Sequence, residues 1–475
     1  MKVLFVSSEA SPFAKSGGLG DVIGSLPIEL VKQDAEAAVI LPLYRAIKEV
    51  YQSELEFINS FDVPLAWRHQ YCGLFKMKHR GVIHYFIDNE QYFLRDDLYG
   101  YFDDGERFAF FSRAVLESLK HMDFEPRILH CNDWQTGLVP VFLKTLYRED
   151  PAYSHLSTVF TIHNIEYQGR FGPEMMDDII GIPLMDRGIV EMDGDINYMK
   201  GAIVTCDKLT TVSPTYEEEL SYPYYGLNLF DIIRQNNYKM KGILNGIDME
   251  RYNPSKDKNL AANYSVRKME GKATNKTALR EQLGLYDEPD VPIIAMVGRL
   301  VEHKGVALVS RVLDEMMTQP MQFVLLGTGD RKYETFFLEK AKSYPGRMVA
   351  VTNFYEELAS RIYAGADMIL MPSLSEPCGL VQLIALRYGT IPIVRETGGL
   401  KDTVHPFNPE TCKGNGLTFA SVNAHDMLYA VRRGQELYKD KELWNKLMKN
   451  ALRSNYSWKK SVKEYKKIYA QLMEA

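Results

Sequence analysis

The chain has 475 residues, of which 46% are hydrophobic and 25% charged, and its formal net charge is −6. A chain of this length exceeds a single hydrophobic core, so we expect two or three domains. The acidic balance argues against a nucleic-acid-binding protein, no apolar run has the length of a membrane span, and the five scattered cysteines are typical of a reduced, cytoplasmic protein without a structural zinc site.

Short apolar runs alternate with helical patterns in two series. The first series predicts strands at residues 2–8, 37–43, 82–88, 126–132, 157–164 and 208–213. Glycine, asparagine and proline near residues 240–250 predict a connector. The second series predicts strands at residues 291–298, 322–329, 347–353, 367–373 and 391–396. Such alternation implies parallel sheets covered on both faces, and therefore two doubly wound α/β domains.

The domain boundaries follow from the two series and from the C-terminal segment. We expect Rossmann-like domains at residues 1–243 and 244–455. Residues 456–475 carry apolar side chains on one helical face. This helix could close the second domain or cross back to the first. Parallel sheets of this kind bind ligands at the carboxyl ends of their strands, so residues just after the strands are the candidates for a site.

The first predicted strand is followed by the glycine-rich segment KSGGLGDV. It is not a P-loop, because Lys15 precedes Gly17, Gly18 and Gly20. It is not a dinucleotide fingerprint either, because the second strand lacks a terminal acid. Two interpretations stay open: a tight turn with an exposed lysine, or a loop whose backbone approaches a ligand, with N–H groups facing an anion.

Two histidines and an aspartate follow other strands of the first half. His130 and Asp133 belong to HCNDW, and His163 belongs to TIHNIEYQG. A structural role is favoured for both histidines, although His163 could also be a base or a ligand. Asp133, next to Trp134, is a better candidate for binding a sugar hydroxyl, unless it only caps a helix.

The second half has two cations, Arg299 and Lys304, just after its first predicted strand. Cations five residues apart across a turn can converge on one diphosphate, arginine as a fork and lysine as a point charge. A basic surface loop is the alternative. The functional interpretation gains weight because the pair occupies the same topological place as Lys15 in the first half.

The most specific segment is PSLSEPCGLVQLIALRYG, residues 372–389. Glu376 precedes Pro377, a favoured first helical residue, and the predicted helix runs to Gly389. The carboxylate could merely cap this helix. Alternatively, it takes sugar hydroxyls while the N–H groups of residues 378–380 bind a phosphate or a hydroxyl.

The segment Asp193-Gly194-Asp195 has an Asp-x-Asp pattern, which holds a divalent metal on a nucleotide-sugar in a different transferase fold. The pattern is weak in an acidic chain and follows no predicted strand, so a solvated turn is favoured. No set of His, Cys and carboxylate residues has convincing metal spacing, and we expect neither a metal nor another cofactor.

Taken in order, these segments resemble the bacterial glycogen synthases and plant starch synthases over nearly the whole chain. KSGGL is similar to their Lys-Thr-Gly-Gly-Leu signature, with Ser16 in place of threonine. The other matching segments are HCNDWQTGLVP, FTIHNIEYQGRF, LTTVSPTY, GILNGID, GRLVEHKG, LLGTGD, PSLSEPCGLVQL and YGTIPIVRETGGLKDTV. The departures are small: Tyr252 stands where the family often has tryptophan, and Ile384 stands where the wider two-domain class often has a second glutamate.

The resemblance implies a GT-B fold, with two facing Rossmann-like domains, a closing cleft and a C-terminal helix that returns to the first domain. It implies a glycosyltransferase that moves glucose from ADP-glucose to the non-reducing end of an α-1,4-glucan, glycogen or a maltooligosaccharide, with retention of configuration. We expect no nucleic-acid or membrane partner, and the oligomeric state stays open.

By residue match, the resemblance also implies roles for individual side chains. The residues expected to bind the donor are Lys15, Gly18, Asn245, Arg299, Lys304, Phe354, Glu376, Cys378, Gly379 and Leu380. Among them, Phe354 is expected to carry the adenine. The residues expected on the sugar and acceptor side are Asp21, Asp133 and His163. The residues expected to act in catalysis are Lys15, His163, Arg299, Lys304 and Glu376.

Other functions remain open from the sequence. One is a nucleotide-sugar transferase or epimerase of the same fold with another substrate. A second is a non-catalytic glucan-binding protein, since 29 tyrosines and 22 phenylalanines allow sugar stacking. A binding protein would not need three cations aimed at a diphosphate. An NAD-dependent oxidoreductase is disfavoured by the missing acid after the second strand.

Overall fold

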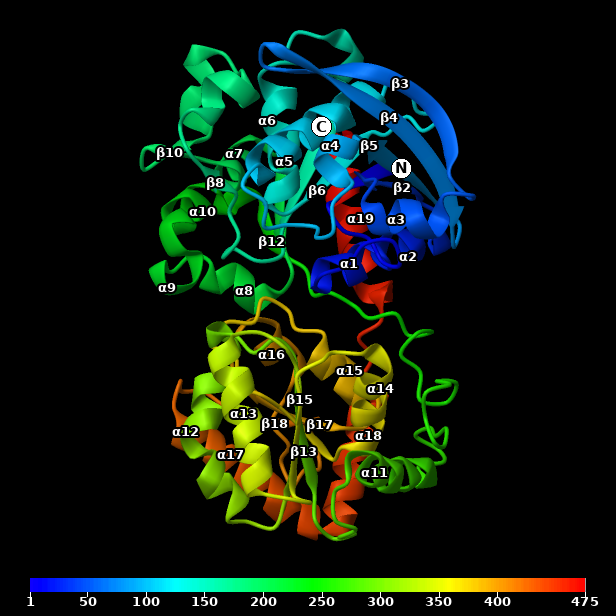
Figure 1. The fold of residues 1–475 in the computed structure, drawn as a ribbon, viewed down its shortest axis with the longest axis vertical. Coiled ribbons are helices and arrows are strands. Elements are labelled where there is room, and N and C mark those ends of the chain that lie inside the picture. The colour runs from blue at the N-terminus through cyan, green and yellow to red at the C-terminus, as the bar shows by residue number, and fades with distance from the viewer. Residues whose placement is uncertain (475) are drawn as a thin grey trace. The chain divides into compact units, whose positions relative to one another are not determined.

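The chain folds into two compact units, which the computed structural model describes over residues 1–474 (Figure 1). The first unit consists of Met1–Gly246 together with the C-terminal helix that starts at Trp458. The second unit is Ile247–Ser457. Each unit is built around a largely or wholly parallel sheet, so the prediction of two doubly wound α/β domains is confirmed.

The first unit holds one mixed sheet, which has nine strands within the described residues, in the order β12-β11-β7-β6-β1-β2-β5-β4-β3. Strands β12 to β5 are parallel, and β4 and β3 add an antiparallel hairpin at one edge. The strands are β1 (Lys2–Val6), β2 (Glu36–Pro42), β3 (Glu56–Leu65), β4 (Arg68–His79), β5 (Val82–Asp88), β6 (Ile128–Asn132), β7 (Ser157–Ile162), β11 (Lys208–Thr211) and β12 (Met240–Gly242).

Two parts of this sheet are not predicted from the sequence: the antiparallel hairpin β3–β4 and the short strand β12. The hairpin strands lack the continuous buried apolar run that is the signal of a parallel strand, and β3 is largely exposed. The three residues of β12 lie in the segment interpreted as a connector. They pair with β11 in parallel, and a strand this short carries no periodicity that would reveal it.

The helices of the first unit lie between its strands in the chain. They are α1 (Gly18–Ile23), α2 (Leu26–Lys32), α3 (Arg45–Tyr51), α4 (Glu90–Phe93), α5 (Asp104–Ser118), α6 (Leu138–Lys144), α7 (Tyr198–Thr205), α8 (Pro214–Glu219), α9 (Pro223–Gly226) and α10 (Phe230–Asn236). A separate small sheet, β8 (Arg170–Phe171), β10 (Asp195–Asn197) and β9 (Glu191–Met192), is antiparallel.

The C-terminal helix α19 (Trp458–Glu474) packs into the first unit, beside α2. Its buried side chains include Val462, Tyr465 and Tyr469, the apolar face that the sequence pattern predicts. The Tyr469 hydroxyl lies 2.7 Å from Nδ1 of His130 on strand β6, and Nε2 of His130 lies 2.6 Å from the Thr161 hydroxyl. His130 is therefore a buried structural histidine, as its pattern indicates.

The second unit holds a sheet of six strands within the described residues, all parallel, in the order β15-β14-β13-β16-β17-β18. The strands are β13 (Ile293–Val297), β14 (Gln322–Leu326), β15 (Met348–Val351), β16 (Met368–Met371), β17 (Ile391–Arg395) and β18 (Leu417–Phe419). Successive residues of a strand point to opposite faces: Ile294 and Met296 enter one core, whereas Ile293 and Ala295 enter the other.

Helices cover both faces of this second sheet (Figure 1). One core contains side chains from α12 (Val306–Met317), α13 (Arg331–Ser343), α17 (Ala424–Lys439) and α18 (Lys441–Arg453). The other contains side chains from α11 (Glu270–Leu283), α14 (Glu356–Gly365) and α15 (Val381–Arg387). The short helix α16 (Gly398–Thr403) follows β17. Because both faces are buried, polar chemistry in this unit is confined to the ends of the strands.

Both sheets reverse their strand order at one point. In the first unit the chain builds outward from β1 through β2 and then returns to β6 on the other side of β1. In the second unit the chain builds outward from β13 through β14 and β15 and then returns to β16 on the other side of β13. The two loops that leave such a pair of strands diverge, and ligands of open α/β sheets bind in the crevice between them.

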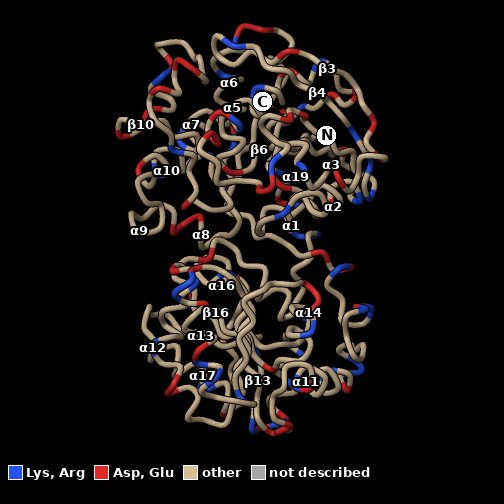
Figure 2. Tube along the Cα trace, in the orientation of Figure 1, with Lys and Arg blue, Asp and Glu red and all other residues tan. Residues whose placement is uncertain are grey.

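Basic and acidic residues are interspersed along the chain in both units (Figure 2). Among residues 1–474, no helix is long and apolar enough to cross a lipid bilayer.

The contact between Tyr469 and His130 predicts that removing the Tyr469 hydroxyl lowers the stability of the first unit. Tyr469→Phe keeps the ring but leaves Nδ1 of the buried His130 without its partner. Such an unsatisfied group costs about 1–3 kcal/mol, so we expect the melting temperature of the first unit to fall by several degrees in scanning calorimetry. The matched control is Tyr429→Phe, because Tyr429 is exposed on the second unit and should leave both transitions unchanged.

Candidate active site

The glycine-rich loop after β1 is held from inside the protein by Glu9. Oε2 of Glu9 accepts hydrogen bonds from the N–H groups of Ser16, at 2.7 Å, and Gly17, at 3.2 Å. Its Oε1 accepts the Ser16 hydroxyl at 2.6 Å and the Tyr99 hydroxyl at 2.8 Å. Sequence patterns did not single out Glu9, although an acid three residues after a buried strand is a recognisable signal.

Lys15 and Asp21 form an ion pair across the same loop, with Nζ of Lys15 2.9 Å from Oδ1 of Asp21. Both side chains are partly exposed. Asp21 stands in the first turn of α1, where the helix dipole favours a negative charge, and Gly18 is the first residue of that helix. The loop therefore presents a lysine whose direction is set by a neighbouring carboxylate.

Asp133, at the end of β6, does not cap the following helix. Its Oδ1 instead accepts the backbone N–H of His163 at 2.7 Å and that of Asn164 at 3.4 Å, and so ties the end of β6 to the end of β7. Desolvation raises the pKa of Asp133 to about 7, against the opposing effect of these two N–H groups. Its backbone has φ 57° and ψ 177°, a region that is essentially restricted to glycine and stores strain.

His163 is neutral near pH 7, because desolvation lowers its pKa to about 3. Its Nε2 lies 2.9 Å from Oδ1 of Asn132. The Asn132 amide donates to the carbonyls of Val6 and His130, so its oxygen must be an acceptor. Nε2 of His163 therefore carries the proton, and Nδ1 is left as an acceptor. The bond to Val6 also links β6 to β1 at the point where the strand order reverses.

In the second unit, Lys304 and Glu376 form a close ion pair at the corresponding reversal, between β13 and β16. Nζ of Lys304 lies 2.8 Å from Oε1 and 2.7 Å from Oε2 of Glu376, and the Ser373 hydroxyl donates to Oε2 at 2.8 Å. Glu376 is buried. Burial alone would raise the pKa of Glu376, but the Lys304 charge and the two hydrogen bonds outweigh it and lower the pKa.

The prediction that a helix starts at Pro377 is wrong. Helix α15 begins at Val381, because Gly379 has φ 73° and breaks the helical conformation. The amide of Gln382 donates to the carbonyls of Cys378 and Gly379, which shapes the turn that these residues form with Leu380. Glu376 is consequently not a helix cap, and its carboxylate is free of any such role.

Arg395 and Gly398 position the segment around Glu376, and the sequence patterns predicted neither role. The buried Arg395, at the end of β17, donates to the carbonyls of Ser373 at 2.8 Å and Leu374 at 2.6 Å. Gly398 has φ 42°, and a Cβ there would lie 2.0 Å from the Glu376 carbonyl oxygen. A charged residue that ends an apolar strand, as in IPIVR, was the available signal for Arg395.

The remaining predicted donor-binding residues also follow strand ends, in their own units. Arg299 comes after β13 and is exposed. Phe354 comes after β15 and is 51% exposed, so its ring is open to a ligand. Asn245 comes after β12 in the first unit and is buried, and its Oδ1 accepts no hydrogen bond from residues 1–474.

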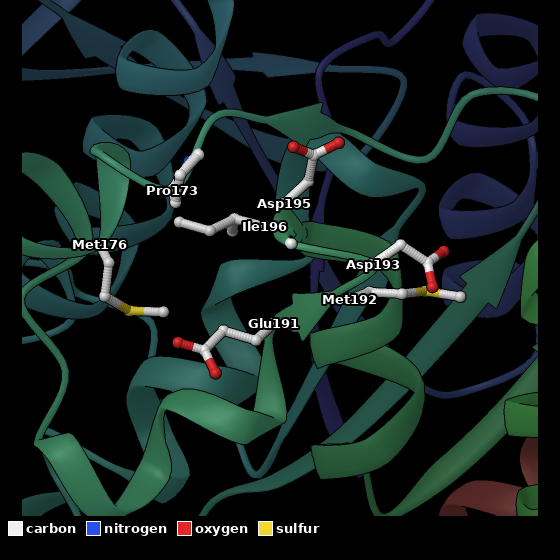
Figure 3. A pocket seen from close by; sticks show the side chains of 8 residues that line it. Pro173, Met176, Glu191, Met192, Asp193, Asp195 and Ile196 are labelled. Atoms are coloured by element: carbon white, nitrogen blue, oxygen red, sulfur yellow. The ribbon is translucent and has the colours of Figure 1, made fainter.

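The segment Asp193-Gly194 is the tip of a hairpin between β9 and β10. Both residues have positive φ, 54° and 84°, as a two-residue Asp-Gly hairpin turn requires, and both are exposed. The solvated turn is therefore observed, although a short strand does precede it. A cavity of about 260 Å³ lies beside this hairpin, and Figure 3 shows Pro173, Met176 and Ile196 around it. None of the predicted site residues lines this cavity.

Comparison with known proteins matches both units. The sequence profile of the starch synthase catalytic domain matches residues 2–235, and that of group 1 glycosyl transferases matches residues 275–454. A glycogen synthase of Geobacillus thermodenitrificans (strain NG80-2) is 50% identical over 478 residues, covering 100% of this chain and 98% of the relative. The chain belongs to the glycogen and starch synthase family. A glycogen synthase of Bacillus cereus (strain Q1) is 49% identical, with both chains covered in full.

One solved structure agrees with this membership of the glycogen and starch synthase family, and a second agrees with the fold. The catalytic domain of starch synthase IV from Arabidopsis thaliana, bound to ADP and acarbose, matches with a TM-score of 0.91 and 32% identity, covering 100% of this chain and 99% of that one. A sucrose-phosphate synthase from Thermosynechococcus elongatus, at 17% identity and a TM-score of 0.62, shares the fold. The predicted family, the GT-B fold and the glycosyltransferase class are confirmed.

The raised pKa of Asp133 predicts a pH-dependent stability. Between about pH 4 and pH 7 the folded state holds a proton on Asp133 that the unfolded state has lost, so this contribution to stability is lost as the pH rises through 7. Asp133→Asn keeps an acceptor oxygen and tolerates positive φ, but it cannot titrate. In urea unfolding at pH 5 and pH 8, the stability of the variant relative to wild type should improve at pH 8. An unchanged difference would contradict the assignment.

The close approach of Gly398 predicts that a methyl group there displaces Glu376. Gly398→Ala should reduce turnover by about 10²-fold, the effect of a misplacement of about 1 Å. The control is Gly188→Ala, because a Cβ on Gly188 meets no atom within 4 Å. Initial rates measured beside circular dichroism separate this effect from unfolding. A folded Gly398→Ala variant with normal turnover would show that the Glu376 position is not critical.

Proposed function

We propose that the protein is a glycogen synthase, which transfers glucose from ADP-glucose to the non-reducing end of an α-1,4-glucan with retention of configuration. The observation that carries this proposal is the Lys304–Glu376 pair, which stands at the sheet reversal of a chain 50% identical to a glycogen synthase over its whole length. The structural relative bound to ADP and acarbose supports a nucleotide-sugar donor and a glucan acceptor.

Glu376 and Lys304 have complementary roles in this reaction. The ammonium group of Lys304 has three donors, and two of them go to Glu376, so one remains for an oxygen of the donor diphosphate. The lowered pKa of Glu376 keeps its carboxylate ionised near neutral pH, where it can accept hydrogen bonds from sugar hydroxyls. Arg299 adds a second cation after the same strand, β13.

Stabilisation of the leaving group is the main requirement of the reaction. When the bond between the anomeric carbon and the diphosphate oxygen breaks, negative charge grows on the diphosphate and the sugar ring becomes oxocarbenium-like. Fixed cations placed at that charge lower the barrier. Lys15, Arg299 and Lys304 supply such cations, and among the described residues no group of three or more His, Cys, Asp or Glu side chains could hold a metal ion.

The acceptor hydroxyl attacks the anomeric carbon from the face that the diphosphate leaves. A new carbon–oxygen bond forms to the acceptor, the bond to the diphosphate breaks, and a diphosphate oxygen takes the hydroxyl proton. The carboxylates of Glu9, Asp133 and Glu376 are engaged by the chain's own donors, so none is assigned as a covalent nucleophile. In this scheme Asn245 and Phe354 bind the donor, and the backbone of His163 lies beneath the anomeric carbon.

The proposal predicts metal-independent transfer that depends on Lys304. We expect wild-type initial rates of labelled glucose transfer from ADP-glucose to glycogen to persist in excess EDTA. Lys304→Ala should lower turnover by about 10²–10³-fold, the loss for one preorganised charge-stabilising group, and Glu376→Gln should cause a comparable loss. Lys439→Ala, on an exposed lysine of the same unit, is the matched control.

Three results would overturn parts of this scheme. No transfer from ADP-glucose, with transfer from UDP-glucose instead, would reassign the donor. Loss of activity in EDTA that magnesium or manganese restores would contradict the metal-free mechanism. A nearly unaffected Lys304→Ala variant would remove that lysine from its role.

A further inference from the structure

The carboxylate of Glu9 occupies the position where glycine-rich loops usually bind a ligand. Backbone N–H groups before a helix commonly face a phosphate of the bound substrate. Here two such groups, those of Ser16 and Gly17, already bind the carboxylate of Glu9, which is 3% exposed. A carboxylate has about four lone-pair sites, and the hydroxyls of Ser16 and Tyr99 occupy the others. These two N–H groups are therefore not available to a substrate.

The bonds to Glu9 order the residues that carry Lys15. Gly17 and Gly18 follow Lys15 and Ser16, and glycines lose more conformational freedom on ordering than any other residue. Fixing a backbone residue in one conformation is entropically unfavourable. The hydrogen bonds from Ser16 and Gly17 to Glu9 offset that cost before a substrate arrives, and they fix the peptide next to Lys15.

A second loop is tied to the same carboxylate. Tyr99 donates its hydroxyl to Glu9 and lies 2.8 Å from the Ser8 hydroxyl, so the segment after β1 and the segment around Tyr99 share one anchor. Burial, followed by the charge of Glu9, raises the pKa of Tyr99 well above its usual value, so the hydroxyl keeps its proton and stays a donor.

From these contacts we infer that Glu9 is a positioning residue for glucosyl transfer: it holds the backbone of Ser16 and Gly17 so that Lys15 is presented in one orientation. This inference rests on the proposed function, in which Lys15 contacts the donor. Glu9 itself touches no substrate in this role, and its effect passes through Lys15.

The geometry of Glu9, rather than its charge, should matter. A glutamine has the same length. Its oxygen can accept the N–H groups of Ser16 and Gly17, and its NH₂ group can donate to the hydroxyls of Ser16 and Tyr99, which accept as well as donate. An aspartate keeps the charge but is one methylene shorter, so it cannot reach all four donors.

The experiment compares Glu9→Gln, Glu9→Asp and Glu9→Leu with wild type, using ADP-glucose and glycogen. We expect kcat/KM for ADP-glucose to stay within a few-fold of wild type in Glu9→Gln, to fall about tenfold in Glu9→Asp and to fall about 10²-fold in Glu9→Leu. In a Lys15→Ala background, Glu9→Leu should add little further loss, because residues that act as a unit are not additive.

Two kinetic outcomes would overturn the inference. An active Glu9→Asp with an inactive Glu9→Gln would show that charge, not positioning, is what the site needs. Full multiplication of the losses from Glu9→Leu and Lys15→Ala would show that Glu9 acts on general stability and not through Lys15. If Glu9→Leu does not fold, the same cycle run with Glu9→Asp decides the point.

Hydrogen exchange separates this inference from the proposed function. The amides of Ser16 and Gly17 should be protected in wild type and in Glu9→Gln, and should exchange faster in Glu9→Asp. This measurement needs no substrate. Protection that follows this order, with no wild-type transfer from ADP-glucose, would overturn the proposed function while supporting the ordering role of Glu9. Equal protection in all variants would overturn that role.

Discussion

Burial of the parallel strands on both faces is the constraint on which the rest of the structure depends. A strand covered by helices on either side has no surface along its length where a polar side chain could be solvated. The polar side chains of a functional site are therefore confined to the strand ends. Glu9 and Lys15 follow β1, Asp133 follows β6, Lys304 follows β13 and Glu376 follows β16. These four strands are the pairs at which each sheet reverses its order, where diverging loops leave room for a ligand.

The carboxylates of Glu9, Asp133 and Glu376, which are partly or fully buried, then stabilise the loops that follow those strands. Each removes a charged group from water, which is unfavourable unless the group is hydrogen-bonded or paired. The groups that contact each carboxylate determine whether its pKa falls or rises. Glu376 faces the ammonium of Lys304, so its pKa falls despite burial. The backbone N–H groups that bind Asp133 do not compensate for desolvation, and the charge of Glu9 adds to it, so the pKa of Asp133 rises to about 7. A buried carboxylate is therefore kept ionised near neutral pH in one unit and titrates near neutral pH in the other.

The features that the sequence predicted share a local signal. Continuous apolar runs predicted most of the parallel strands, and glycines, cations and acids just after those runs predicted Lys15, Asp133, Lys304 and Glu376 as candidates. Two of the features that it missed have no such signal. The exposed hairpin β3–β4 lacks an apolar run, and the helix after Glu376 starts late because of the backbone conformation of Gly379. Glu9 and Arg395 were missed because their importance depends on partners elsewhere in the chain.

By itself, the sequence determined the two α/β units, the positions of most of their parallel strands and the family, because hydrophobic periodicity and ordered motifs are properties of short segments. Only the tertiary structure decided that Lys304 pairs with Glu376, that Glu9 fills the glycine-rich loop and that the C-terminal helix packs into the first unit. The physical reason is that each of these contacts joins segments that the chain brings together only by folding. Their energies arise from burial and hydrogen-bond geometry, and neither exists until the surrounding core has formed.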